Sequence, residues 1–312
     1  MGCVERGPAP TPGEDARRRV QARPSDDTLR WLIEAVAPGG EVTEVAVMKG
    51  GSTVAMRRIT VRSTEGAERF VVLRRYVLDD ILSETPDIAI HEAHAIRVVA
   101  PLGLPTPELL AHDPSGHRTD SPALVLSWLY GRPAWETLTR HQLDAMVEAL
   151  LVLHSASDET RAGLRSLERY EQTVYEPPRW TARPDLWERA FEIFHGPIPT
   201  GDLALVHRDF HPGNLLWTRR RLTGIVDWQS ACVGPASIDV GHCRLNMFHY
   251  SVDQADQLRN AWERGSGHAY DPWADVVSII GILDTFRTHR RASTSLARIE
   301  HALAAAVASL TG

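Results

Sequence analysis

The chain contains no long hydrophobic run, and this limits where it can reside. No stretch of about 18 apolar residues occurs, so a membrane span is not expected. The first residues, Met1 to Arg6, hold no apolar signal core, and Arg6 stands where a myristoylation motif requires Ser or Thr. We therefore expect a cytoplasmic protein that has no membrane partner.

Cysteine and excess positive charge are also scarce. Cys3, Cys232 and Cys243 fit neither a disulfide framework nor a CxxC zinc pattern, so reduced side chains are expected. The net charge is −6 and the isoelectric point is near 6.2. Nucleic-acid binding needs clustered cations, so we expect no nucleic-acid partner. The sequence is compatible with a monomer or a homodimer.

Lysine is almost absent, because Lys49 is the only one among 34 basic residues. Biased codon usage in the source genome is a sufficient explanation for this. A functional site that needs a cation is then expected to use arginine.

The order of the sequence patterns indicates an α+β protein with two lobes. Residues 1–24 contain four prolines and few large apolar groups, and we expect a disordered tail. Residues 25–126 are expected to form a small β-rich N-lobe, because strand-like segments separated by turns dominate them. Residues 127–133, SWLYGRP, are typical of a hinge. Residues 134–312 are expected to form a larger, mainly helical C-lobe.

Within the N-lobe, the strand pattern is interrupted by one glycine-rich turn and one helix. Lys49 and the residues Gly50, Gly51 and Ser52 separate the first two strands. Thr85 is expected to cap a helix that has Pro86 at its first position.

The stretch LVHRDFHPGNLLW, residues 205–217, places several polar and ionisable groups between apolar segments. The segments LALV, NLLW and GIVDW read as short buried strands, and a polar turn joins the last two as a hairpin. Asp209 and Asn214 then lie on a loop between buried strands, and Asp227 lies at the end of the next strand. This order can bring Asn214 and Asp227 side by side, with Asp209 opposite them.

These three residues suit phosphoryl transfer. The Asn214 oxygen and the Asp227 carboxylate are hard oxygen ligands of the kind that Mg²⁺ binds. Asp209 can orient an acceptor hydroxyl and take its proton, a role that contributes about 10²–10⁴-fold to the rate. His207 and His154 are interpreted as structural side chains that make hydrogen bonds.

The segment HRDFHPGN resembles the HRDxxxxN catalytic loop of kinases, which carry out phosphoryl transfer. The longer pattern HxDxHPGNxLW, followed by a strand ending in DW and then GPxxxDxG, resembles the aminoglycoside phosphotransferase and choline kinase group. The resemblance extends from about Glu41 to the C-terminal helices and implies a protein-kinase-like fold. It also implies ATP or GTP as phosphoryl donor, Mg²⁺ as cofactor, and a small hydroxyl compound as acceptor.

The resemblance assigns a role to each matching residue of the loop and the glycine-rich turn. Asp209 matches the catalytic base, and Asn214 and Asp227 match the magnesium ligands. The turn that lies over the nucleotide phosphates is matched by Gly50, Gly51 and Ser52. A plain hairpin turn is the alternative interpretation of this turn.

Further matches fall on the N-lobe and the hinge. Glu92 matches a glutamate that pairs with a strand cation, and Arg74 stands where kinases carry lysine. An arginine there keeps the charge and can hold phosphate with two donors. The hinge backbone that would bind adenine is matched by Ser127, Trp128 and Leu129. Asp239 matches an aspartate that braces the catalytic loop through backbone contacts.

Two other function classes remain open on the sequence alone. A metal-dependent hydrolase is one, because His207, Asp209, His211, Asp227 and His242 offer nitrogen and oxygen ligands for zinc or iron. A nucleotide-binding module without transfer activity is the other, because Arg74 replaces the usual lysine. A solvated turn without function explains the spacing of the polar residues least well.

The acceptor is not fixed by the motif, because one scaffold serves many acceptors. An aminoglycoside-type antibiotic is favoured, with choline, a sugar or another metabolite as alternatives. An acidic C-terminal region would suit a polycation; its residues are Asp253, Asp256, Glu263, Asp271, Asp275 and Asp284. Trp262, Tyr270 and Trp273 could instead form an aromatic wall for a quaternary ammonium or a sugar. Solvated helix faces are the favoured explanation of the acidic residues, and core packing is the favoured explanation of the aromatic ones.

Overall fold

The computed structural model describes residues 12–48, 54–135, 138–170, 175–284 and 293–312. The chain forms two compact units, Met1–Arg97 with Pro107–Trp128 and Val98–Thr106 with Leu129–Gly312. The division after Trp128 falls inside the segment 127–133 that the sequence marks as a hinge. The short segment Val98–Thr106 belongs to the second unit, whereas the sequence placed it in the first lobe.

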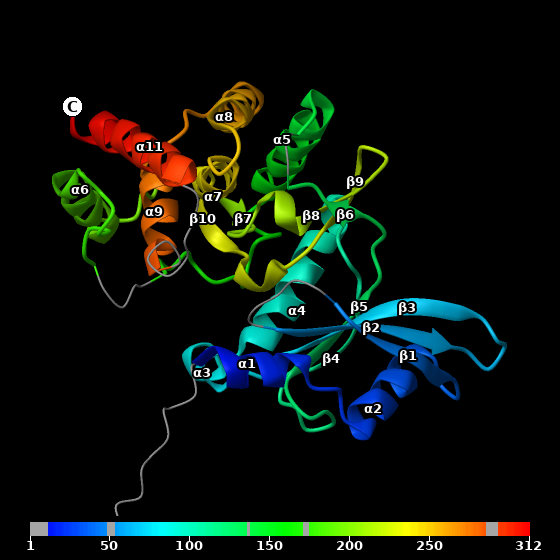
Figure 1. The fold of residues 1–312 in the computed structure, drawn as a ribbon. Helices are drawn as coiled ribbons and strands as arrows, with labels where there is room; N and C mark the ends of the chain where they lie inside the picture. The colour runs from blue at the N-terminus through cyan, green and yellow to red at the C-terminus, as the bar shows by residue number, and fades with distance from the viewer. Residues whose placement is uncertain (1–11, 49–53, 136–137, 171–174, 285–292) are drawn as a thin grey trace, which may run out of the picture. The chain divides into compact units, whose positions relative to one another are not determined.

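The first unit is built on one antiparallel sheet of five strands in the order β1-β2-β3-β5-β4 (Figure 1). Its strands are β1 (Glu41–Val47), β2 (Ala55–Arg62), β3 (Glu68–Arg75), β4 (Leu109–Asp113) and β5 (Ala123–Ser127). Its helices are α1 (Pro12–Gln21), α2 (Asp26–Val36), α3 (Asp79–Glu84) and α4 (Ile88–Val99), the last of which ends in the second unit.

Helix α2 packs against the sheet because its apolar residues fall on one face. Ser25 caps the helix by accepting the Thr28 N–H at 3.1 Å. Leu29, Trp31 and Leu32 then join the apolar side chains of the sheet in one core cluster. The sheet contributes Ile59, Val61, Val71, Leu73, Ala123 and Val125 to this core.

The N-terminal segment differs from the disordered tail expected over residues 1–24. Residues 12–21 form helix α1, while residues 1–11 lie outside the described part of the chain. The Arg57 guanidinium, only 2% exposed, donates to the carbonyls of Val20 and Ala22 at 2.9 and 2.8 Å. Arg75 also donates to Ala22. The segment is therefore ordered by hydrogen bonds from buried arginines, which a prediction from apolar content does not detect.

Helix α4 also begins later than expected. Thr85 does not cap it; the Thr85 N–H donates to the Ile81 carbonyl and so ends helix α3. Helix α4 begins at Ile88 and carries Glu92, which is 1% exposed, on its buried side.

The second unit is mainly helical, with two small sheets. Its helices are α5 (Arg140–His154), α6 (Pro184–His195), α7 (Ser237–Met247), α8 (Val252–Ser266), α9 (Trp273–Gly281) and α11 (Ser293–Thr311). Its strands are β6 (Arg132–Pro133), β7 (Leu203–Val206), β8 (Leu215–Thr218), β9 (Arg221–Ile225) and β10 (Cys232–Pro235). The expected α+β class, with a β-rich first part and a helical second part, is confirmed.

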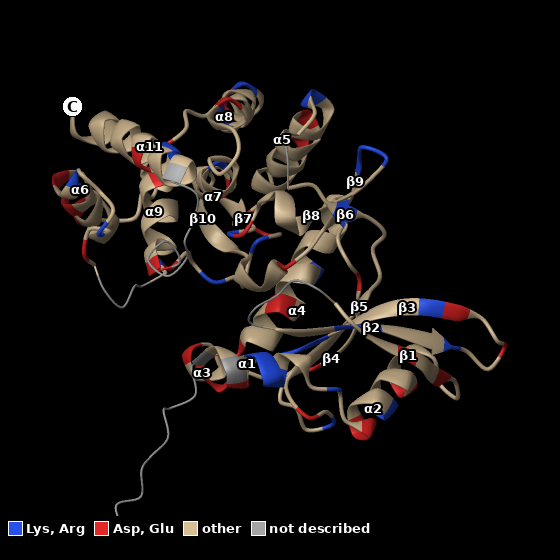
Figure 2. Ribbon diagram, in the orientation of Figure 1, with Lys and Arg blue, Asp and Glu red and all other residues tan. Residues whose placement is uncertain are grey.

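The small sheets hold the segments that flank the polar loop. Strand β7 pairs with β10, and β8 pairs with β9 and β6. The β8–β9 hairpin turns on Arg219 and Arg220, whose φ angles of 48° and 69° fit the two-residue turn that suits the twist of a hairpin. Figure 2 shows the basic residues at this tip. The loop of residues 207–214 is therefore anchored at both of its ends by buried strands.

Among the residues that the structure describes, no helix is long and apolar enough to cross a membrane. Cys232 and Cys243 are buried free thiols, and burial raises the pKa of Cys232 to about 12.

Candidate active site

The loop that follows β7 is fixed first by the buried ring of His207. Its Nδ1 accepts the Asp209 N–H at 3.3 Å, so the proton lies on Nε2, which donates to the Val226 carbonyl at 3.1 Å. The ring also packs against Trp228, with 4.4 Å between the centroids. Both nitrogens are engaged within the protein, which agrees with the structural role expected for His207.

Helix α7 holds the start of the same loop through Asp239. The two carboxylate oxygens accept the His207 and Arg208 N–H groups at 2.8 and 2.7 Å. These bonds stabilise Arg208 in the left-handed region, at a φ of 70°. Burial raises the pKa of the Asp239 carboxyl, but hydrogen bonds from His154 and the His207 N–H outweigh it and hold the pKa below its usual value.

His154 completes this support from helix α5. Its Nδ1 accepts from the Trp262 indole N–H at 3.1 Å, and its Nε2 donates to Asp239 at 3.2 Å. The interpretation of His154 as a core residue that makes hydrogen bonds is therefore confirmed, and the loop backbone is tied to three helices through one buried carboxylate.

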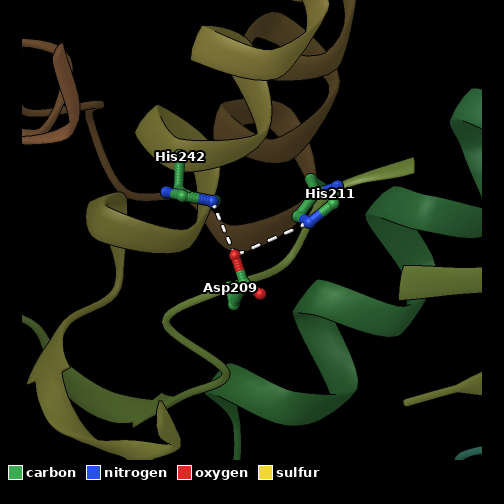
Figure 3. Close-up of side chains that lie close together, drawn as sticks. All are labelled: Asp209, His211 and His242. Atoms are coloured by element: carbon green, nitrogen blue, oxygen red, sulfur yellow. Dashed lines mark ion pairs between the residues drawn. The ribbon is translucent and has the colours of Figure 1, made fainter. Parts of the chain in front are cut away.

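Asp209 lies further along the loop, and neighbours hold both of its carboxylate oxygens. Oδ2 accepts from Asn214 Nδ2 at 2.8 Å, while Oδ1 lies 2.9 Å from His242 Nε2 and 3.6 Å from His211 Nε2 (Figure 3). Burial raises the pKa of Asp209, but the hydrogen bond and charge of His242 reverse this and hold the pKa well below its usual value. The side chain is 32% exposed, so an ionised carboxylate faces solvent.

His211 shapes the turn of the loop. Its Nδ1 accepts the Gly213 N–H at 3.0 Å, and its ring packs against Trp135 with centroids 5.3 Å apart. A Cβ at Gly213 would lie 2.1 Å from the Trp135 ring, so glycine is required there. Burial lowers the pKa of His211 to about 4, against the opposing charge of Asp209.

Asn214 and Asp227 lie on adjacent segments of the hairpin. The Val226 N–H donates to the Asn214 carbonyl at 3.0 Å, which ties the residue before Asp227 to Asn214. The Asn214 amide nitrogen binds the Asp209 carbonyl and carboxylate, so its oxygen is directed elsewhere. Asp227 has a φ of 71°, in the left-handed region that aspartate adopts more readily than most non-glycine residues. One amide oxygen and one carboxylate fit a magnesium ion that retains water and phosphate ligands.

The ligand set of a metal-dependent hydrolase assembles only in part. Asp209, His211 and His242 form a group whose candidate ligand atoms lie within 4.8 Å of one another. His207 cannot join it, because both of its ring nitrogens are engaged with the chain. Asp227 is not a member of the group either. This leaves the hydrolase interpretation with three of its five expected ligands.

In the first unit, the structure brings together the predicted cation and glutamate. Arg74 Nε lies 3.1 Å from Glu92 Oε2, and the two side chains are only 5% and 1% exposed. The hydroxyl of Tyr76 also donates to Glu92 Oε2. Burial raises the pKa of Tyr76 well above its usual value, so the hydroxyl keeps its proton.

The other nucleotide residues are placed less fully. Gly50, Gly51, Ser52 and also Lys49 lie outside the described residues. Ser127 ends strand β5, and its N–H donates to the Glu108 carbonyl at 2.9 Å. Adenine binding at the hinge would therefore use other backbone groups of Ser127, Trp128 and Leu129.

The side chains considered for the acceptor prove to be largely structural. Trp262, Tyr270 and Trp273 are at most 8% exposed, so the aromatic wall is wrong and the core-packing interpretation is confirmed. Asp275 is buried and pairs with Arg244 at 3.0 Å. Asp256 pairs with the same arginine at 2.8 Å, so two of the acidic side chains neutralise a cation of the fold.

The contacts of two residues, His242 with Asp209 and Tyr76 with Glu92, were not predicted from the sequence. His242 was considered only as a hydrolase ligand, although it lies three residues after Asp239 and therefore on the same side of a helix. Tyr76 follows Arg74 at the two-residue spacing that places strand side chains on one face. Both spacings can be read from the sequence once Asp239 and Arg74 have been assigned their roles.

Comparisons with known proteins bear on the fold and the family of the chain. A protein from Ralstonia eutropha, provisionally named an aminoglycoside phosphotransferase, superposes with a TM-score of 0.62 at 15% identity and covers 92% of this chain and 99% of its own. The macrolide 2′-phosphotransferase MphH from Brachybacterium faecium superposes with a TM-score of 0.58 at 18% identity, and the match covers 91% of this chain and 98% of MphH. A thermostable mutant of the aminoglycoside phosphotransferase APH(4)-Ia, in complex with ADP and hygromycin B, gives 0.58 at 16% identity, with 92% and 99% covered.

At these identities the structural matches establish the fold alone, which is the kinase-like fold of these phosphotransferases. The family follows from the sequence itself, because the model of one family matches residues 58–276 and so spans both units. The chain therefore belongs to the phosphotransferase enzyme family.

Proposed function

We propose that the protein is an ATP-dependent phosphotransferase that O-phosphorylates a hydroxyl group of a small molecule. The observation that carries the proposal is the state of Asp209. Its carboxylate is ionised, partly exposed, and held by Asn214 and His242 at 2.8 and 2.9 Å. Family membership supports the same reaction class.

Asp209 acts on the acceptor hydroxyl in this reaction. The hydroxyl oxygen forms a bond to the γ-phosphorus, the bond from that phosphorus to the bridging oxygen breaks, and ADP leaves. Because the pKa of Asp209 is low, the carboxylate is a weak base that orients the hydroxyl and receives its proton as the new bond forms. This timing fits a loose transition state, which requires little deprotonation beforehand.

Asn214 and Asp227 would hold Mg²⁺, and the ion would neutralise charge on the nucleotide phosphates. The protein holds these two residues through the Val226–Asn214 hydrogen bond and the left-handed backbone of Asp227. In the first unit, Arg74 would contact phosphate while Glu92 fixes its side chain. The glycine-rich turn and the hinge would bind the rest of ATP or GTP, and relatives crystallised with ADP and AMP-PNP support a nucleotide donor.

The first acceptor to test is an aminoglycoside-type antibiotic, because several similar structures carry that name and those of APH(4)-Ia include complexes with hygromycin B. Macrolides come next, because a macrolide phosphotransferase superposes comparably. Choline and simple sugars complete the set of acceptors.

A screen of these acceptors with ATP and Mg²⁺ tests the proposal, with the phosphorylated product identified by mass. For the acceptor found, Asp209→Ala should lower kcat about 10²–10⁴-fold and leave ATP affinity nearly unchanged. Asp227→Ala should instead raise the Mg²⁺ concentration required for nucleotide binding. ATP binding without a product from any acceptor would favour a nucleotide-binding module, and full activity of Asp209→Ala would remove the assigned role.

A further inference from the structure

Helix α7 contacts the catalytic loop in two places that lie three residues apart. Asp239 binds the backbone N–H groups of His207 and Arg208, at 2.8 and 2.7 Å. His242 binds the side chain of Asp209 at 2.9 Å. Residues at this spacing lie on one face of a helix, so a single face of α7 fixes both the path of the loop and the direction of its carboxylate. Figure 3 shows His242 directed at Asp209.

His242 is itself placed firmly. Its side chain is 11% exposed, and its carbonyl accepts from Asn246 Nδ2 at 3.0 Å. The preceding residue, Gly241, packs so closely against Ala274 of α9 that a Cβ there would lie 2.7 Å from the Ala274 backbone. The helix backbone at His242 therefore has little freedom to shift away from the loop.

The hydrogen bond also defines which atom carries the proton. A carboxylate oxygen only accepts, so His242 Nε2 must donate to Asp209 Oδ1. His211 makes no comparable bond, because its Nε2 lies 3.6 Å away and its Nδ1 binds Gly213. Asn214 donates to Oδ2 at 2.8 Å from the other side. The carboxylate is thus held at one oxygen by the loop and at the other by α7.

We propose that His242 is a positioning residue for phosphoryl transfer: by donating to Asp209 Oδ1 it fixes the rotamer of the carboxylate, so that the remaining lone pairs face the acceptor hydroxyl. The inference rests on the proposed function, because it assigns Asp209 as the group that receives the proton. His242 acts only through Asp209 and does not itself exchange a proton with the acceptor. An aspartate held at Oδ2 alone can rotate, and small misplacements of a reacting group cost large factors in rate.

Two variants at His242 separate the donor from the bulk of the side chain. His242→Leu keeps much of the volume but donates no hydrogen bond, whereas His242→Gln offers an amide N–H near the position of Nε2. His268→Leu is the matched control, because it removes another histidine–aspartate pair, His268–Asp202 at 3.0 Å, in which both side chains are about half exposed. Thermal unfolding of each variant establishes that it is folded.

The measurement is kcat and KM for ATP, with the acceptor found in the screen or with water as acceptor if none is found. His242→Leu should lower kcat about 10–100-fold and change KM for ATP less than about threefold. His242→Gln should recover most of the rate, and His268→Leu should match the wild type. A kcat of His242→Leu equal to that of the wild type would overturn the inference, as would equal losses in the Leu and Gln variants.

A double variant tests whether His242 acts through Asp209. In an Asp209→Ala background, His242→Leu should cause no further loss, since no carboxylate remains to be positioned. Additive losses would contradict the inference. If the wild type transfers no phosphoryl group at all, the proposed function fails. A normal response to Asp209→Ala with a fully active His242→Leu would overturn this inference alone.

A spectroscopic test does not depend on activity or on the folding of the Leu variant. The ¹⁵N chemical shifts of the His242 ring should show a protonated Nε2 in the resting enzyme, and Asp209→Ala should perturb that resonance. An unprotonated Nε2, or a resonance insensitive to Asp209→Ala, would exclude the bond on which the inference depends.

Discussion

The candidate functional carboxylates of the two units, Glu92 and Asp209, differ in their exposure and in the groups that hold them. In the first, Glu92 is 1% exposed and faces the Arg74 cation directly. In the second, Asp209 is 32% exposed and is held by the donors of Asn214 and His242. Paired buried charges compensate each other, so removing either partner leaves an uncompensated charge inside the unit. A carboxylate that hydrogen bonds hold at an exposed position keeps its orientation and its capacity to accept a proton.

The charged groups of the two units therefore have different roles. The buried pair defines the shape of the first unit and places one guanidinium. The loop of the second unit places its charge by a chain of contacts from α7, which itself remains buried. Substitutions in the first unit should therefore appear mainly as changes in stability, and substitutions around the loop mainly as changes in turnover.

The variant Glu92→Ala should have the largest effect, and it tests whether the buried pair stabilises the first unit. It leaves the Arg74 guanidinium buried without its carboxylate and should lower the free energy of unfolding by about 3–5 kcal/mol. Denaturant unfolding followed by fluorescence measures this loss. Glu41→Ala, at an exposed pair with Arg62 where the Glu41 side chain is 63% exposed, is the control and should cost less than about 1 kcal/mol. Equal losses in the two variants would mean that the buried pair is not special.

Asp239→Ala should affect stability and turnover together. It removes the acceptor of two buried backbone N–H groups, for a loss of about 2–4 kcal/mol. Because Arg208 and Asp209 follow directly, kcat should fall about 100-fold. Unfolding curves and steady-state rates measure the two effects. Asp158→Ala, at a carboxylate that is 91% exposed, should change neither; unchanged kcat in a folded Asp239→Ala protein would contradict the bracing role.

The smallest expected effect concerns Asp120, which binds the N-terminal segment to the first sheet. Burial raises the pKa of Asp120, but the Ser25 N–H and Arg75, both donating at 2.8 Å, outweigh it, and the folded pKa lies below the unfolded one. The carboxylate therefore contributes stability above the unfolded pKa, and this contribution is lost as the pH falls through the folded pKa.

Asp120→Asn should consequently cost about 1 kcal/mol at pH 7 and progressively less towards pH 3. Unfolding titrations at several pH values measure the difference between the two proteins. Asp27→Asn, at a side chain that is 76% exposed, is the control and should cost less than Asp120→Asn at pH 7. A cost that stays constant down to pH 3 would show that the charge of Asp120 is not involved.

Much of the architecture was predictable because local patterns and tertiary packing agree. The helical spacing of Leu29, Leu32, Ile33 and Val36 predicts a helix, and the structure has one at Asp26–Val36. The pairing of Arg74 with Glu92 followed from the family resemblance, and both residues meet in the core. The sequence placed Asp209 opposite Asn214 on one loop, and in the structure a 2.8 Å hydrogen bond joins the two side chains.

The rest depends on contacts between distant residues that leave little local trace. Helix α1 is held by Arg57 and Arg75 of the sheet, and such long-range bonds to backbone carbonyls have no periodicity. For Trp262 and Trp273, core packing was the favoured interpretation, but a binding wall stayed open because spacing does not report burial. The contact of His242 with Asp209 joins a helix to a loop and requires the tertiary fold.

The order in the N-terminal segment has a practical consequence for protein production. A shortened chain that starts at Pro24 would look harmless from composition, yet it would strip the carbonyls of Val20 and Ala22 from a guanidinium that solvent hardly reaches. A chain shortened for crystallisation should therefore still include Pro12 and the residues after it, so that the hydrogen bonds from Arg57 and Arg75 to this segment are retained.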